Sequence, residues 1–199
     1  NTYASCWFYV NAPDGSSVVS RACASAGHVN LPPLLSTQAY TVIVQPWRAS
    51  AGGGVLSLLA PVTAALTIDG SPVTLATTVA GQSAQFSFSG VAGQRVGALA
   101  TADTFPQCLQ FSLVRPDGTV QAVPPSGCWG GLFLGAETLA STGTYWVVRE
   151  PNSAVTGSTT MRVVTVPADV SDTATVGGPA RTLTTPALGQ DATLSFTGT

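Results

Sequence analysis

The chain has 199 residues, of which 45% are hydrophobic and 8% charged, and its formal net charge is −2. All seven basic residues are scattered arginines, which excludes the basic patch of a nucleic-acid-binding protein, and the low charge with many apolar residues is the reverse of a disordered chain. Gly, Pro, Ser or Thr interrupts the apolar runs before they reach the roughly 18 residues of a membrane-spanning helix.

The first predicted element belongs to a block that returns later in the chain. Cys6–Gly15 reads CWFYVNAPDG, and Cys108–Gly118 reads CLQFSLVRPDG. Both blocks end in Pro-Asp-Gly, where Pro presets φ and Gly accepts a positive φ, so each predicts a turn. The later block places Leu109, Phe111 and Leu113 on one face, which is the period-2 pattern of a strand.

Two further blocks recur in the same order. Ser36–Val44 reads STQAYTVIV and returns as Ser141–Arg149, STGTYWVVR, with one tyrosine in the same place in each. Ser71–Gly90 returns as Gly178–Gly198. Matches in order over nearly the whole chain indicate an internal repeat.

The repeated segments also contain the clearest strand patterns. Ala84–Ser89 alternates apolar and polar residues and places Phe86 and Phe88 on one face. Tyr145–Val148 and Met161–Val166 are further runs of β-branched and aromatic residues. Because no segment shows a sustained 3.6-residue period, these runs predict strands and no helices.

The matches define a unit of about 105 residues that is out of phase with the ends of the chain. We expect an all-β fold of tandem β-sandwich, jelly-roll-like units with antiparallel strands, about seven or eight in each unit. Residues 1–61 are then the later part of a repeat that lacks its opening strands. Residues 62–168 are a complete repeat, and residues 169–199 are the opening strands of the next.

The complete unit resembles a known family of secreted domains. Gly81–Val96 reads GQSAQFSFSGVAGQRV, and it is followed by LVRPDG at Leu113–Gly118 and STGTYWVV at Ser141–Val148. This series resembles bacterial pre-peptidase C-terminal domains, and in particular their tandem arrays in large secreted or surface proteins. The resemblance implies a β-sandwich that is accessory or structural rather than catalytic.

The four cysteines fall at equivalent positions of two repeats. Cys6 corresponds to Cys108, and Cys23 corresponds to Cys128. Four cysteines allow three pairings, and the repetition favours Cys6–Cys23 and Cys108–Cys128 disulfides, which close each copy on itself. Zinc is the alternative, but no C-x-x-C occurs in the sequence. Disulfides predict an oxidising location, which is the cell surface, the periplasm or the outside of the cell, and we expect a secreted protein outside the cell or at its surface.

The sequence predicts that the protein is not an enzyme. It holds no G-x-S-x-G nucleophile elbow, and its single histidine, His28, lies in a Ser/Ala/Gly stretch without a nearby acid. The two glutamates, Glu137 and Glu150, have no matching acid in the earlier copy, so a paired-carboxylate hydrolase is not expected. We therefore expect no catalytic residue, no cofactor and no metal ligand.

The tryptophans leave a binding function open as the alternative. Two of them adjoin cysteines, which favours packing over a disulfide or at a unit interface above a sugar-stacking platform. The four tryptophans are Trp7, Trp47, Trp129 and Trp146. An exposed cluster of them would instead indicate a non-catalytic carbohydrate- or cell-surface-binding accessory module of a secreted enzyme or toxin.

The favoured function is that of a structural repeat in an extracellular filament or giant surface protein. Residues 1–61 would have an unpaired sheet edge, and residues 169–199 would have strands without a core. The tail segments that contain Leu183, Leu194 and Phe196 would complete the head of the next copy by β-strand addition, a contact that propagates head to tail. Covalent continuation of the units in a longer array is the alternative arrangement. The expected partner is thus another copy, with a glycan or cell-surface ligand as a further possibility, and no nucleic acid or membrane span.

Overall fold

The computed structural model describes residues 6–23, 29–32, 34, 36–47, 51–106, 111–123, 133–151 and 153–198. These ranges contain fourteen strands and no helix, so the predicted all-β class is confirmed. None of the described residues therefore forms a helix that could span a membrane.

Strands β4 to β12 form a central sandwich of two sheets. One sheet has the order β4-β6-β11-β8-β9, and the other has the order β10-β7-β12-β5. The strands are β4 (Val62–Ala65), β5 (Val73–Ala76), β6 (Ala84–Gly90), β7 (Arg95–Asp103), β8 (Phe111–Val114), β9 (Val120–Ala122), β10 (Phe133–Thr138), β11 (Gly143–Arg149) and β12 (Ser158–Thr165).

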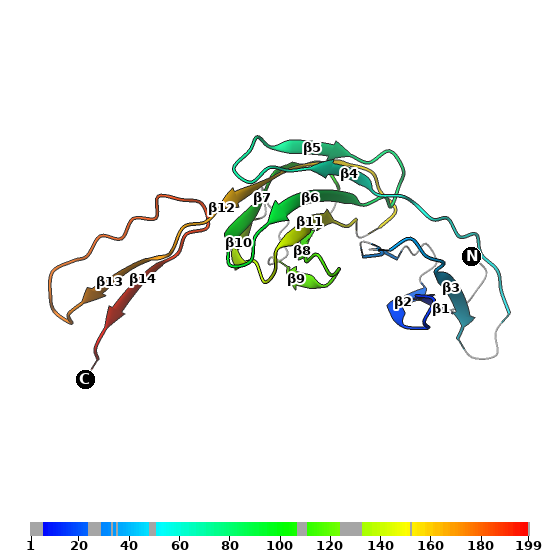
Figure 1. Ribbon diagram of the computed structural model, residues 1–199, viewed down its shortest axis with the longest axis horizontal. Helices are drawn as coiled ribbons and strands as arrows, with labels where there is room; N and C mark the ends of the chain where they lie inside the picture. Colours follow the sequence, from blue (N-terminus) through cyan, green and yellow to red (C-terminus); the bar gives the residue numbers. More distant parts are fainter. Residues whose placement is uncertain are drawn as a thin grey trace.

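Two smaller sheets flank the central sandwich. Near the N-terminus, β1 (Cys6–Asn11), β2 (Ser17–Cys23) and β3 (Thr41–Pro46) form an antiparallel sheet of order β2-β1-β3. Near the C-terminus, β13 (Val170–Ala174) and β14 (Ala192–Phe196) form a two-stranded sheet. Figure 1 shows these two sheets on opposite sides of the central sandwich.

The core lies between the two sheets of the sandwich. Phe86 and Phe88 point into it from β6, and Met161 and Val163 face them from β12. All four side chains are at most 2% exposed. The alternating phenylalanines that predicted β6 are therefore residues that face the core, and the alternate apolar residues of β12 face it from the other sheet. Leu109, the first residue of the predicted alternating run that leads into β8, lies outside the described residues.

Two strand pairs are parallel, although the sequence led us to expect antiparallel strands. They are β4 with β6, and β13 with β14. The physical reason is visible in the first pair, because the chain crosses to the opposite sheet to form β5 before it returns as β6. Such a crossover brings the second strand back in the direction of the first.

Candidate assembly site

The predicted disulfide at the start of the chain is compatible with the strand register. Cys6 begins β1 and is 2% exposed, and its directly opposed residue is Cys23, the last residue of β2. Directly opposed residues of an antiparallel pair have Cα atoms about 4.5–5.5 Å apart, which is within the range of a disulfide. The Cys6–Cys23 bond stays a prediction. Cys108 and Cys128 lie outside the described residues.

The two glutamates weighed as catalytic acids both accept hydrogen bonds from amide side chains. Glu137 accepts one from Gln121 at 3.3 Å, and Glu150 accepts one from Asn30 at 3.2 Å. His28 lies outside the described residues. Among the described residues, no three His, Cys, Asp or Glu side chains gather in a group that could hold a metal ion.

One arginine is fully buried, at the end of β11. The Arg149 guanidinium pairs with Asp103 at 3.3 Å and lies 4.4 Å from the centre of the Phe105 ring. Burial raises the pKa of the Asp103 carboxyl, and the charge of Arg149 partly opposes that shift. The buried guanidinium thus has a partly buried carboxylate as its partner, and this pair ties β11 to the end of β7.

The β13–β14 pair has the same register as the β4–β6 pair. Val62 lies opposite Ala84 in the central sandwich. In the C-terminal pair, Val170 lies opposite Ala192, so both partners are displaced by 108 residues (62 to 170 and 84 to 192). The C-terminal pair therefore has the local structure of one side of the central five-stranded sheet.

The turn before the second strand of each pair is also the same. The Gln82 side chain donates to the carbonyl of Ala60 at 2.7 Å. Likewise, the Gln190 side chain donates to the carbonyl of Ala168 at 2.6 Å. These bonds attach each turn to the residues just before the first strand, and they help set the register of both pairs.

The N-terminal sheet corresponds to the other side of the central five-stranded sheet. Val10 of β1 lies opposite Val42 of β3, and Leu113 of β8 lies opposite Val147 of β11. The pairing with the next strand is interrupted at the same place, directly after Val10 and directly after Leu113. The order β2-β1-β3 thus matches the order β9-β8-β11.

The Pro-Asp-Gly turns of these two regions agree in detail. Asp14 accepts hydrogen bonds from the backbone and side chain of Ser16 at 2.9 and 2.6 Å. Asp117 accepts the same two bonds from Thr119 at 2.9 and 2.6 Å. These bonds lower the pKa of both carboxyl groups, led by the side-chain hydroxyl in each case. The glycine after each Asp has a φ of +83° or +82°, as the turn prediction requires.

The outer edges of β3 and β14 are open, in contrast to their central counterparts. In the central sheet β6 lies between β4 and β11, whereas in the described part of the chain β14 pairs with β13 alone and β3 with β1 alone. Apolar side chains on both strands are exposed. They are Val42 (39%), Ile43 (43%), Leu194 (40%) and Phe196 (68%).

Of the three assembly residues named from the sequence, two lie on this open edge. Leu194 and Phe196 are in β14. Leu183 is half-buried and lies outside the strands, between β13 and β14. Its counterpart 108 residues earlier is Leu75, which is in β5 and pairs with Thr159 of β12. A strand at Leu183 would need a partner equivalent to β12.

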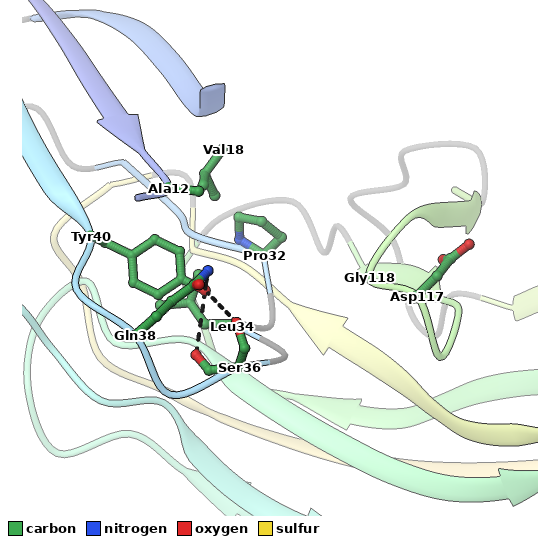
Figure 2. Close-up of a pocket in the computed structure, with 9 residues that line it drawn as sticks. All are labelled: Ala12, Val18, Pro32, Leu34, Ser36, Gln38, Tyr40, Asp117 and Gly118. Atoms are coloured by element: carbon green, nitrogen blue, oxygen red, sulfur yellow. Dashed lines mark hydrogen bonds between the residues drawn. The ribbon is translucent and has the colours of Figure 1, made fainter. Parts of the chain in front are cut away.

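A pocket of about 280 Å³ lies beside Tyr40, just before β3. Figure 2 shows Leu34, Ser36 and Gln38 around the ring, with Asp117 across from them on the turn between β8 and β9. The phenol of Tyr40 accepts a hydrogen bond from Gln38 at 3.1 Å and donates to the carbonyl of Ser36 at 3.4 Å. We call this the Tyr40 pocket.

The sequence predictions named residues on the tail side of this site, and for the head side they predicted an unpaired sheet edge within residues 1–61 without naming its residues. The open edge of β3 and the Tyr40 pocket were not among the predicted residues. The signal was nevertheless present, because STQAY at residues 36–40 and STGTY at residues 141–145 are matched in the sequence. A strand that corresponds to a central strand of a sheet, but has lost one neighbour, is expected to have an open edge.

Two solved structures are similar to part of the chain. The pre-peptidase C-terminal domain of a collagenase from Bacillus anthracis is 9% identical, with a TM-score of 0.41 over 54% of this chain and 99% of that one. PliG of Aeromonas hydrophila, a periplasmic inhibitor of g-type lysozyme, is 12% identical, with a TM-score of 0.34 over 52% of this chain and 99% of that one. Both scores are low, so the fold assignment rests on the strands and sheets described above. No family model matches the chain, and no curated protein is similar to it in sequence.

Proposed function

We propose that the chain is a structural repeat of an extracellular filament or giant surface protein, in which units join head to tail through sheet edges. The observation that supports this function best is the division of one sheet. The five-stranded sheet β4-β6-β11-β8-β9 is whole in the middle of the chain. Its two sides occur again, separately, as β13-β14 and β2-β1-β3.

This division of the sheet indicates how two copies would join, and we call their contact the joint. If β14 of one copy lies beside β3 of the next, the order β13-β14-β3-β1-β2 matches the order of the central sheet. The added hydrogen bonds would satisfy two open edges, and the exposed apolar residues of both strands would be covered. Because the two edges differ, the contact is heterologous and each copy offers a new edge to the following one.

The composition and the predicted disulfides agree with this function. Because only 8% of the residues of the chain are charged, its surface is poorly protected against self-association, which suits units that meet through their edges. Disulfides at Cys6–Cys23 and Cys108–Cys128 would belong outside the cell or at its surface. Neighbouring copies are joined either as separate chains or as segments of one longer polypeptide.

Electron microscopy and mass measurement test this function. The 199-residue chain at high concentration should form extended filaments, and Leu194→Asp should prevent them because it places a charge in the joint. Thr197→Asp is the matched control, because its central counterpart, Ser89, is exposed. Particles of one chain's mass at every concentration would contradict the proposal. The intact mass of the native polypeptide then separates single chains, near 20.1 kDa, from a covalent array.

A binding module is the second candidate, and one observation favours it. Trp7 and Tyr9 stack on β1 with ring centres 6.4 Å apart, and Trp47 follows β3 with 52% of its surface exposed. Stacked aromatic rings are a suitable surface for sugar rings. Binding on a glycan array that is lost in Trp7→Ala would support this function, and absence of binding would count against it.

A further inference from the structure

The central sandwich shows how a pocket of this kind is filled. The ring of Phe88 on β6 stacks against Tyr145 of β11, with centres 5.7 Å apart. Gly90 lies so close to the same place that an added Cβ would be 2.3 Å from Leu139 Cδ1. Tyr145 and Leu139 are consequently 0% and 1% exposed. One phenyl ring and one residue without a side chain therefore close this space.

Three residues of the Tyr40 pocket correspond to residues at this closed space in the central sandwich, and its other walls include Ala12 and Val18 from the β1–β2 region and Asp117 from the β8–β9 turn. The three are Leu34, Ser36 and Tyr40, which stand 105 residues before the leucine, serine and tyrosine of the central sheet (34 to 139, 36 to 141, 40 to 145). The serine hydroxyl lies 3.3 Å from the tyrosine hydroxyl in both places. Leu34, however, is 45% exposed. The local structure of the pocket is thus already formed before anything covers it.

We propose that the Tyr40 pocket is the binding site for Phe196 and Gly198 of a second copy of this chain. This inference rests on the proposed function, and it adds the register and the residues that determine it. The expected cross-strand pairs are those of β11 with β6, transferred to β3 and β14. They are Tyr40 with Phe196, Val42 with Leu194, and Val44 with Ala192.

The size and chemistry of the pocket fit a phenyl ring. The pocket has a volume of about 280 Å³ and is open to solvent, so a ring from another chain can reach it. Phe196 is 68% exposed on its own strand, so its ring is available for insertion. Each of the transferred pairs brings together two aromatic or two aliphatic side chains, and such cross-strand contacts stabilise neighbouring strands.

The glycine at position 198 gives a second, independent indication. An added Cβ at Gly198 would meet no heavy atom within 4 Å, so the fold of its own chain does not require a glycine there. At the equivalent Gly90, the space is blocked by leucine and tyrosine side chains. A side chain at position 198 would meet Leu34 and Tyr40 of the second copy in the same way.

The experiment compares the critical concentration for assembly of the full 199-residue chain and its variants. Gly198→Val and Phe196→Ala should each raise it by about tenfold or more. Thr197→Val is the matched control, because it places the same valine at the neighbouring position, where it replaces only a hydroxyl by a methyl group, and it should assemble as the parent does. Thermal unfolding of each variant at low concentration should match that of the parent chain, which shows that only the joint has changed.

A double substitution identifies the contact itself. Gly198→Ala should weaken assembly, and Leu34→Ala in the same chain should restore much of it, because removing the leucine side chain makes room for the new methyl group. Normal assembly of Gly198→Val, or strictly additive effects of the two alanine substitutions, would overturn the inference while the filament function stands. Failure of the parent chain to assemble would overturn both.

Discussion

The central five-stranded sheet and the two sheets at the ends of the chain have the same local structure but very different burial. The strand registers, the shift in pairing after Val10 or Leu113, and the Pro-Asp-Gly turns agree between the two regions. Yet Phe88 is 2% exposed, whereas its counterpart Phe196 is 68% exposed. Registers and turns are therefore kept in the absence of the next strand of the sheet, whereas burial depends on that strand.

The comparison also shows what each end lacks. A two-stranded sheet is marginal in water by itself, because too little apolar surface is buried. The β13–β14 pair is held at its base by the Arg95–Asp169 ion pair at 2.8 Å, while the exposed residues of β14 have no second layer against them in the described structure. We expect the end sheets to contribute little to the stability of a single chain.

The largest expected effect on the free energy of unfolding comes from substituting one of two equivalent phenylalanines, Phe88 in the central sheet and Phe196 in the C-terminal sheet. Phe88→Ala should lower the free energy of unfolding by about 3–5 kcal/mol, because it removes a buried aromatic ring. Phe196→Ala should change it by less than about 0.5 kcal/mol in dilute solution, because that ring is exposed. Urea unfolding at low concentration measures both, and equal effects would show that β14 is buried within a single chain.

Reduction of the predicted disulfides should have the next largest effect on the free energy of unfolding. Each predicted disulfide closes a loop that contributes up to about 3 kcal/mol to the free energy of unfolding. Peptide mapping without reduction should recover Cys6 joined to Cys23, and Cys108 joined to Cys128. A bond between the two halves would contradict the prediction, as would four thiols that react fully with a thiol reagent.

A smaller effect is expected at Asp69, which connects the β4–β5 turn to β12. Its carboxylate accepts the backbone N–H of Thr165 at 2.8 Å and the hydroxyl of the same residue at 2.7 Å. Asp69→Asn should lower the free energy of unfolding at neutral pH by about 1 kcal/mol. Thr165→Val is the control, because it removes the hydroxyl bond alone and should have roughly half that effect.

The pKa of the Asp69 carboxyl group determines the direction in which its contribution to stability changes with pH. The two bonds from Thr165, led by the backbone N–H, lower the pKa of Asp69 below its ordinary value of 3.8. Its contribution to stability is therefore complete above that value and is lost as the pH falls through the lowered pKa. Unfolding of the parent chain should consequently become easier in acid by more than unfolding of Asp69→Asn, and parallel pH curves would contradict this.

The smallest effects are expected at the two matched turns. Asp14→Ala and Asp117→Ala each remove the same pair of hydrogen bonds from a solvent-exposed turn. Hydrogen exchange of the Ser16 and Thr119 amides should accelerate to a similar extent in the respective variants. A much larger change at Thr119 would show that the local structures of the two regions are not equivalent.

The sequence predicts those parts of the fold that depend on neighbouring residues. The alternation around Phe86 and Phe88 predicts β6, and the Pro-Asp-Gly turns have the expected positive φ. The parallel β4–β6 pair was not predicted, because no local sequence pattern indicates which strands will pair across a long connection. Arg149 was missed for a related reason, since its burial depends on Asp103 and Phe105, which are distant in the sequence.

Of the candidate site, too, only part could be predicted from the sequence. The exposed apolar residues of the tail, Leu194 and Phe196, could be named because their counterparts in the complete unit form a clear strand pattern. Leu183 belongs to a segment that is a strand only in the central copy, where β12 is its neighbour. The Tyr40 pocket is lined by residues from distant parts of the chain, among them Ala12, Tyr40 and Asp117, and no single sequence pattern describes that arrangement.

The places at which the chain enters and leaves the central sandwich have a mechanical consequence. The chain enters the sandwich at β4 on one side and leaves it from β12 on the other (Figure 1). A pulling force along the chain would therefore act lengthwise on both strands, and β12 has neighbours on both of its edges, β7 and β5. Under such a load the hydrogen bonds between strands share the force and must break together, whereas a force across the strands would open them one at a time.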